Sequence, residues 1–202
     1  MTLRTRTLAW SAGLTGVLAV VLVVSAGVGP VAIPPATVAK VLLSADPLPA
    51  TFEVARTSRI IVLDVRLPRI ALAAFVGVAL ATAGTVMQGF FRNPMADPSI
   101  VGVSSGAAVG AVATIVLPVA FPFGLELQGA AFLAAVLTAF GVYLIATQGG
   151  HTPTATLLLA GVAVQTFLGA VISLLLLHSG RSLRRIVYWL MGHLGGTTWD
   201  EV

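Results

Sequence analysis

The sequence predicts an all-α protein, a polytopic transmembrane helical bundle, and three observations support this fold class. Of the 202 residues, 57% are hydrophobic and 9% are charged, whereas a soluble domain has about 25% charged residues. The mean hydropathy is +1.02. Uncharged apolar stretches of about 20 residues recur along the chain, and each is long enough to cross a bilayer as a helix. A transmembrane barrel would instead show alternating segments of about ten residues.

Charge and cysteine content exclude several other classes. The net charge is only +4, and the basic residues lie almost entirely between the apolar stretches, which fits membrane interfaces and argues against a nucleic-acid partner. The chain has no cysteine, so disulfides, thiolate metal sites and lipidated cysteines are excluded. The single lysine, Lys40, lies in no G-x-x-x-x-G-K-[ST] motif, so the chain has no P-loop for ATP. We find no catalytic motif, metal site or cofactor site.

Five membrane spans are expected, near residues 8–28, 70–91, 100–120, 127–147 and 155–177. Leu, Ile, Val and Phe each favour insertion by about 0.3–0.6 kcal/mol at mid-helix, whereas Arg, Lys or Asp there costs about 2.5–3.5 kcal/mol. The charged connectors must therefore lie outside the hydrocarbon core. The first stretch follows Arg4 and Arg6, as in a signal peptide, but it is too long for a signal core, so we interpret it as a retained helix.

The segments between the spans also carry predictions. The long first connector, residues 29–69, contains "PPATVAKVLL", which predicts a short amphipathic helix opened by proline. It continues through a charged stretch, residues 46–69. After the fifth span, Gly180 should break the helix and Ser182 can cap a short outer helix near residues 182–191. Gly195 and Gly196 should end that helix, and Trp199 resembles the start of a sixth span.

Small residues recur every fourth position in three of the spans, which places each row on one helix face. Such rows let membrane helices approach closely, so we expect a compact bundle with the second helix at its centre. The rows are Ala73, Gly77, Ala81, Thr85 and Gly89 in the second span; Gly102, Gly106, Gly110 and Thr114 in the third; and Gly161, Gln165, Gly169 and Ser173 in the fifth.

The connector "RNPMADPS", residues 92–99, is polar between two uncharged spans. Pro94 should stop the helix before it. Asp97 can cap the next helix with Pro98 at its first position, and a carboxylate there suits the positive end of the helix dipole. The connector is therefore a tight polar hairpin, although a turn alone would not need this order of Arg92, Asn93 and Pro94.

The segment from residue 66 to residue 110 closely resembles the signature of the FecCD-type permeases. The matching elements are Arg66-x-Pro68-Arg69, Gln88, Arg92-Asn93-Pro94-hydrophobic-Ala-x-Pro98, and Gly102-x-x-x-Gly106. Two later segments, "LLLAGVAV" at 157–164 and "YWLMGHLGGTTW" at 188–199, match in the same order. The resemblance implies the type II ABC importer permease fold, of which about five of about ten spans are present, so the chain is expected to be a fragment or a truncated gene product.

The resemblance also implies a function and partners. It predicts the translocation subunit of a binding-protein-dependent ABC importer for a ferric siderophore, haem or cobalamin, in the bacterial inner membrane. The implied partners are a second permease copy (as a homodimer or pseudo-dimer), ATP-binding cassette subunits that hydrolyse the ATP, an extracytoplasmic substrate-binding protein and the lipid bilayer. The alternative is a stand-alone channel or intramembrane enzyme, which would need intramembrane acid–base pairs or pore-lining charges, and the predicted spans contain neither.

The resemblance and the charge rule predict opposite orientations of the chain in the membrane. The resemblance implies a cytoplasmic N-terminus. The positive-inside rule favours the reverse, because three basic residues lie on the N-terminal side and eight on the other. The first group is Arg4, Arg6 and Arg92; the second is Lys40, Arg56, Arg59, Arg66, Arg69, Arg181, Arg184 and Arg185. We follow the resemblance because outward arginines have a function in that family.

Arg66 and Arg69 are the sharpest candidate site. The helix dipole disfavours cations at a helix N-terminus by about 0.3–1 kcal/mol each, and both arginines are expected there. In the family this end faces outward and the arginines receive carboxylates of the binding protein, a role that suits the guanidinium fork. Anchoring to lipid headgroups is the alternative.

Further residues acquire roles only through the resemblance. The outer mouth of the translocation path is assigned Arg181, Arg185, Gln165 and His193, and the cytoplasmic gate Thr154 and Thr156. Alternatives remain for several of them. His193 also fits an ordinary loop residue, the threonines fit helix capping, and Gln88 and Gln165 fit polar packing between helices. Tyr188 and Trp189 fit an interfacial aromatic belt.

Overall fold

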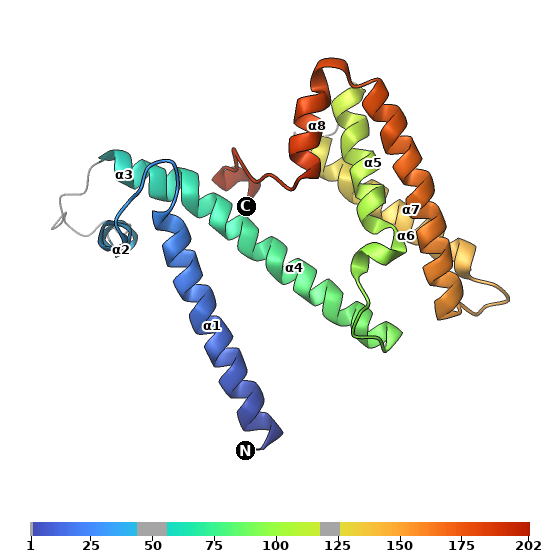
Figure 1. The fold of residues 1–202 in the computed structure, drawn as a ribbon, viewed down its shortest axis with the longest axis horizontal. Helices are drawn as coiled ribbons and strands as arrows, with labels where there is room; N and C mark the ends of the chain where they lie inside the picture. The colour runs from blue at the N-terminus through green and yellow to red at the C-terminus, as the bar shows by residue number, and fades with distance from the viewer. Residues whose placement is uncertain (1, 44–55, 118–125) are drawn as a thin grey trace. The chain divides into compact units, whose positions relative to one another are not determined.

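The computed structural model describes residues 2–43, 56–117 and 126–202, and they form an all-α protein (Figure 1). The longer helices are α1 (Leu3–Gly27), α2 (Pro35–Leu43), α4 (Leu67–Phe91), α5 (Val103–Val116), α6 (Glu126–Ala146), α7 (Thr154–Leu177) and α8 (Leu183–Leu190). The shorter ones are α3 (Arg56–Ile60), the π-helix η1 (Ile61–Arg66), and the 3₁₀ turns η2 (Pro98–Val101), η4 (Gly180–Ser182) and η5 (Trp199–Glu201).

Within the described residues, four helices are long and apolar enough to cross a membrane: α1, the continuous helix Arg56–Phe91, α6 and α7. The expected third span, residues 100–120, is occupied by α5, whose 14 residues extend about 21 Å, less than the roughly 30 Å of a bilayer core. Gly102 explains the late start of α5, because its φ of 80° interrupts the chain between η2 and α5. Positions 118–120 of that expected span, and 46–55 of the charged stretch, lie outside the described residues.

The chain divides into two units. The first contains Met1–Gly77 and Leu194–Val202. Its core joins the end of α1 to α2 and η1 through Ala26, Val38 and Val62, each at most 1% exposed. The helix expected in "PPATVAKVLL" is α2, and it turns Val38 inward, as an amphipathic helix opened by proline should.

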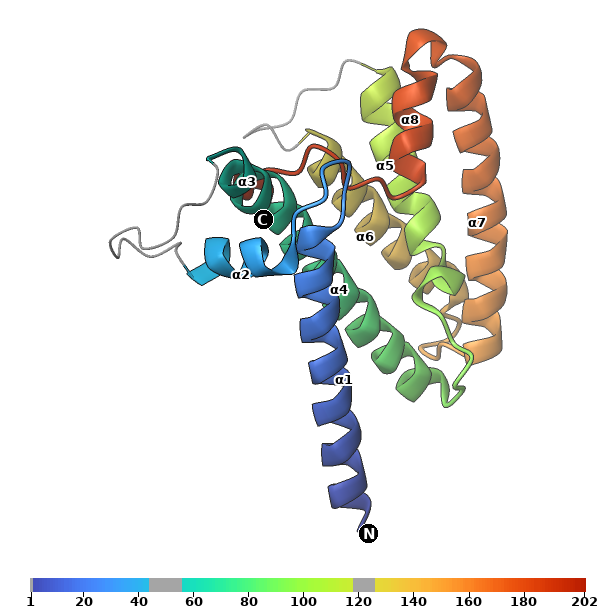
Figure 2. The ribbon, with the colours of Figure 1, turned by 60° about the vertical axis from the view of Figure 1, so that its left-hand side comes forward.

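The second unit is Val78–His193. In it α5 packs against both α6 and α7 (Figure 2). A Cβ added at Gly106 would overlap the Thr138 hydroxyl, and one at Gly110 would overlap the Ala130 carbonyl oxygen. One added at Gly161 would likewise overlap the carbonyl oxygen of Ile100. The close packing expected of the third span is confirmed, as is that at Gly161 in the fifth.

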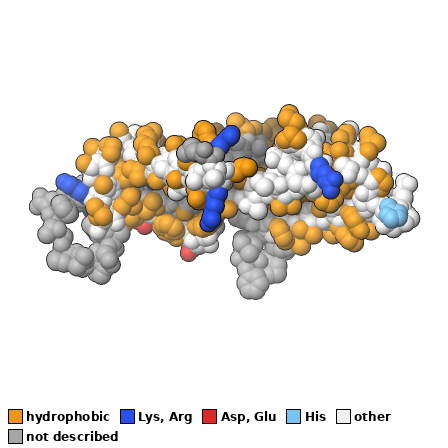
Figure 3. All heavy atoms as spheres, turned by 90° about the horizontal axis from the view of Figure 1, so that it is seen from below, with side chains coloured by type: hydrophobic (Ala, Val, Ile, Leu, Met, Phe, Trp, Pro, Cys, Tyr) orange, Lys and Arg blue, Asp and Glu red, His pale blue; other side chains and the backbone are white. Residues whose placement is uncertain are grey.

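The small-residue row of the second span behaves differently, and our expectation of close packing on it is wrong for the described residues. A Cβ added at Gly77 or Gly89 would meet no described atom within 4 Å, and Ala73 and Ala81 are exposed. Small residues permit close approach but do not cause it. Exposed hydrophobic side chains cover much of the surface, as Figure 3 shows for one face, which suits helices in contact with lipid.

The polar hairpin is built by two local motifs. Asp97 caps as expected, with its carboxylate accepting from the Ser99 N–H at 2.7 Å and Pro98 at the first helical position, but it caps η2 rather than α5. Hydrogen bonds from the Ser99 hydroxyl and then the Ser99 N–H hold the pKa of Asp97 below its ordinary value. This contribution to stability is present at neutral pH and is lost as the pH falls through that lowered pKa.

Arg92 ends α4, before Pro94 is reached. Its φ is 48°, and Asn93 donates from its N–H to the Gln88 carbonyl while Arg92 donates to that of Gly89. This is a Schellman motif, in which glycine usually occupies the left-handed position. An arginine there costs backbone strain, and this turn requirement was not visible in the sequence pattern.

Candidate functional site

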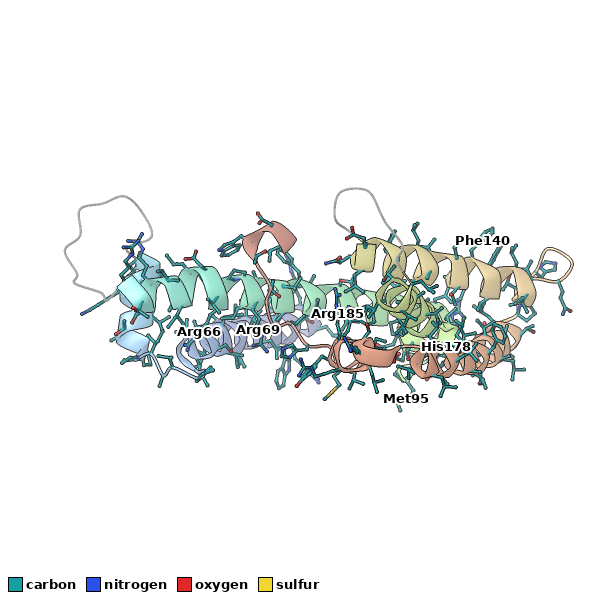
Figure 4. The ribbon with its side chains drawn as sticks, turned by 90° about the horizontal axis from the view of Figure 1, so that it is seen from above. Arg66, Arg69, Met95, Phe140, His178 and Arg185 are labelled. Carbon is teal, nitrogen blue, oxygen red and sulfur yellow. The ribbon has the colours of Figure 1, made fainter. Side chains whose placement is uncertain are left out.

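The first unit contains a cleft of about 850 Å³. Three segments line it: the end of α1 with the loop after it, the stretch from η1 into α4, and residues 194–198, which we name the strap. Most of the lining is apolar, and Asp64, Arg66 and Arg69 supply its charges. Arg66 and Arg69 lie inside the long helix Arg56–Phe91, 10 and 13 residues after its first residue (Figure 4). The cleft is the candidate functional site because it brings together the two predicted arginines and part of the segment "YWLMGHLGGTTW".

The Arg66 side chain is buried and makes its hydrogen bonds within the chain. It is 8% exposed, and its Nη1 donates to the Ala26 carbonyl at 2.6 Å while its Nη2 donates to the Val31 carbonyl. Ala26 lies in the last turn of α1, where carbonyls lack helical partners and the dipole is negative. The guanidinium therefore fastens the loop after α1 to the end of that helix.

Gly29 is a further residue of this arrangement that the sequence reasoning missed. A Cβ added there would lie 2.7 Å from Nη2 and 3.1 Å from Cζ of Arg66. Only a residue without a side chain leaves room for the guanidinium in its observed position. The signal in the sequence was a glycine directly after the first apolar stretch, which is also the ordinary signal for a helix end.

The expected placement of the two arginines at a helix N-terminus is wrong. The helix runs without a break from Arg56 to Phe91, so both arginines lie inside it. Arg66 is buried against carbonyls, which fits neither an open docking side chain nor a headgroup anchor. Arg69 is exposed on the cleft and is the arginine that a partner can reach.

Pro68 is fully buried just inside α4, and the π-helical segment η1 ends two residues before it. Leu67 donates from its N–H to the Val62 carbonyl, five residues back. The Trp199 indole N–H donates to the Leu63 carbonyl at 2.9 Å and so ties the end of the strap to this segment. Sequence reasoning assigned Trp199 to a sixth span and missed this contact.

The residues assigned to the outer mouth belong to the second unit. Arg181 is in η4, Arg185 is in α8, and both are exposed. His193 is exposed too, and its ring lies 5.5 Å from that of Tyr188. Its N–H donates to the Tyr188 carbonyl in the turn that ends α8 at Gly192, whose φ is 72°. Gly192 therefore ends the helix, not Gly195 and Gly196 as expected.

The threonines assigned to the gate begin α7. The N-cap of α7 is Pro153, with no side-chain cap, so the structure gives no support to the capping interpretation of Thr154 and Thr156. Two hydroxyls missed by the sequence reasoning, Thr147 and Thr152, lie 2.8 Å apart and join the two sides of the α6–α7 connector.

The two glutamines expected inside the membrane, Gln88 in α4 and Gln165 in α7, are exposed in the structure. Among the described residues, no group of three or more His, Cys, Asp or Glu side chains could hold a metal ion.

These features define a polytopic α-helical membrane protein with an arginine-bearing cleft. The chain belongs to the FecCD transport family, whose model matches residues 17–202. It is 50% identical to the cobalamin import system permease protein of Halobacterium salinarum, over 98% of this chain and 61% of that protein. It is 41% identical to the hemin transport system permease protein of Yersinia pestis, over 69% of this chain and 43% of that protein.

A solved ABC transporter assigned to the metal-chelate type, in an inward-facing conformation, has the same fold. It matches with a TM-score of 0.68 and 29% identity, over 93% of this chain and 54% of that one. The fold is therefore that of a type II ABC importer permease. The chain spans about half the length of the proteins it matches.

Proposed function

We propose that the chain is part of the membrane-spanning translocation subunit of an ABC importer for a metal chelate. The observation that carries this proposal is the exposed Arg69 on the cleft of the first unit, in a chain of the FecCD family. Cobalamin, haem and ferric siderophores remain the candidate substrates. Two of them are named for the Halobacterium and Yersinia relatives.

Arg69 would receive a carboxylate of an extracytoplasmic substrate-binding protein. An exposed guanidinium can bind a carboxylate through two parallel hydrogen bonds. Asp64 lines the same cleft, so a partner with one acidic and one basic group would fit better than a uniformly acidic one. Arg66 would act indirectly, because it holds the loop that forms the facing wall of the cleft.

Charge reversal at Arg69 should impair uptake in the complete permease. Arg69→Glu replaces an attraction by a repulsion at a solvent-exposed rim, where a single pair contributes about 0.2–1 kcal/mol. Binding-protein association should slow, and added salt should reduce the difference. The matched control is Arg59→Glu, an exposed arginine on the same helix that does not line the cleft. Equal uptake by both variants would remove the docking role from Arg69.

Energy and assembly would come from other chains. A separate ATP-binding subunit would hydrolyse ATP, and a second permease copy would complete the path, as a homodimer or pseudo-dimer. Arg181, Arg185, Gln165 and His193 would line the outer mouth of that path. Thr154 and Thr156 would close its cytoplasmic end.

The N-terminus should be cytoplasmic in the bacterial inner membrane. The chain has no cysteine, so Thr2→Cys and Ser58→Cys give single reporters on either side of α1. A membrane-impermeant maleimide added to intact cells should label position 58 and spare position 2. Labelling of position 2 alone would reverse the proposed orientation.

A further inference from the structure

In the hydrogen-bond register of η1, the backbone carbonyl of Leu63 has no backbone N–H from which to accept. Leu67 donates five residues back, to Val62, and the next donor in that register would be residue 68, paired with the Leu63 carbonyl. Residue 68 is proline, which has no N–H. The contact at the Leu63 carbonyl is exposed, so without a backbone donor this carbonyl must accept from a side chain or from water.

The Trp199 indole N–H is the donor to the Leu63 carbonyl instead. It donates to the Leu63 carbonyl at 2.9 Å, across 136 positions of sequence. All the residues concerned belong to the first unit. The Trp199 side chain is 51% exposed, so partial burial of the ring also contributes, and a test of the hydrogen bond must keep an aromatic side chain at this position.

We propose that Pro68 and Trp199 form a latch that holds the strap in place as one wall of the Arg69 cleft. Pro68 removes the competing backbone donor, and the indole binds the carbonyl that this frees. The strap begins four residues after α8 ends at Leu190, and the latch holds the end of the strap that is farther from α8 in the sequence. Trp199 is thus a positioning residue. This goes beyond the proposed function, since the latch concerns how the chain holds its own cleft.

Opening of the strap can be measured through Thr197. Its side chain is 9% exposed, and the chain contains no other site for thiol reagents. In a Thr197→Cys chain purified in lipid nanodiscs, the maleimide reaction rate reports how often the strap leaves the helix. Trp199→Phe keeps an aromatic ring and removes the N–H donor, so labelling should speed up by about fivefold, as expected from the loss of one ordinary hydrogen bond.

Pro68→Ala restores a backbone N–H that can compete for the Leu63 carbonyl. It should speed labelling on its own, and Trp199→Phe should then add little, because the indole has already lost its acceptor. Trp10→Phe, a change at an exposed tryptophan of α1 in the same unit, is the matched control and should leave the rate unchanged.

Two results would overturn the latch. One is labelling of Trp199→Phe at the rate of the parent, and the other is an equal acceleration by Trp199→Phe with and without Pro68→Ala. If Pro68→Ala does not fold, nitrogen-15 NMR of the tryptophan indoles decides. The latch predicts slower exchange with D₂O for the Trp199 N–H than for that of Trp10, and equal exchange rates would contradict it.

Discussion

Gly110→Ala should destabilise the second unit by about 2–3 kcal/mol, the upper part of the range for overpacking a close contact. The added Cβ would overlap the Ala130 carbonyl oxygen and lie 2.7 Å from the Ala134 Cβ and 2.9 Å from the Ala130 carbonyl carbon. A backbone atom cannot rotate away as a side chain can, so α5 and α6 must separate. Denaturation of the purified chain in detergent, followed by circular dichroism, measures the loss.

The same substitution at open positions provides the control. Gly141 in α6 and Gly169 in α7 have no described neighbour within 4 Å of an added Cβ. Alanine there should be neutral or stabilise by up to about 1 kcal/mol, since it favours helix over glycine. If Gly110→Ala behaves like Gly141→Ala, the tight α5–α6 contact does not form in the protein.

Arg66→Met should destabilise the first unit by about 2–4 kcal/mol. It removes two hydrogen bonds from a charged donor, each of about 1.5–3 kcal/mol, and part of this is recovered by water at the half-buried Val31 carbonyl. Arg66→Lys should restore only part of the loss, because one ammonium cannot reproduce the planar fork that reaches both carbonyls. The same denaturation experiment measures both variants.

Two comparisons separate this effect from a general loss of charge. Arg59→Met, at an exposed position of the same helix, should stay within about 0.5 kcal/mol of the parent. Gly29→Ala should also destabilise, because its Cβ displaces the guanidinium, and it should add little to Arg66→Met. Additive losses from Gly29→Ala and Arg66→Met would show that the two residues do not act through the same contact.

The sequence predicts the helices well because apolar length and composition are local properties. The α-helical class, the proline-opened α2, the Asp97 cap and the glycines of α5 all follow from patterns within about 20 residues. The Arg-x-Pro-Arg motif was expected at the start of a helix but lies inside the helix Arg56–Phe91, and its two arginines were treated alike. Their difference depends on the Ala26 and Val31 carbonyls, which lie 40 and 35 positions away, and no local pattern reports such a contact.

The errors in the second span have a related cause. A small-residue row predicts that another helix can pack closely on that helix face. Whether such a helix is present depends on the whole assembly, and the row itself does not report it. The Trp199 contact was missed for a similar reason. It depends on a π-helical register at Pro68, and this register becomes visible only when the hydrogen bonds of the helix are traced.

The central claim is that this chain belongs to an importer driven by a separate ATPase, and reconstituted transport tests it most directly. The complete permease is placed in proteoliposomes with its ATP-binding subunit, with ATP inside and the substrate-binding protein outside. Radiolabelled cobalamin, haem and a ferric siderophore are supplied in turn. We predict accumulation of at least one chelate, and only when the ATPase, ATP and binding protein are all present. Equal uptake without the ATPase would contradict the claim and favour a stand-alone channel.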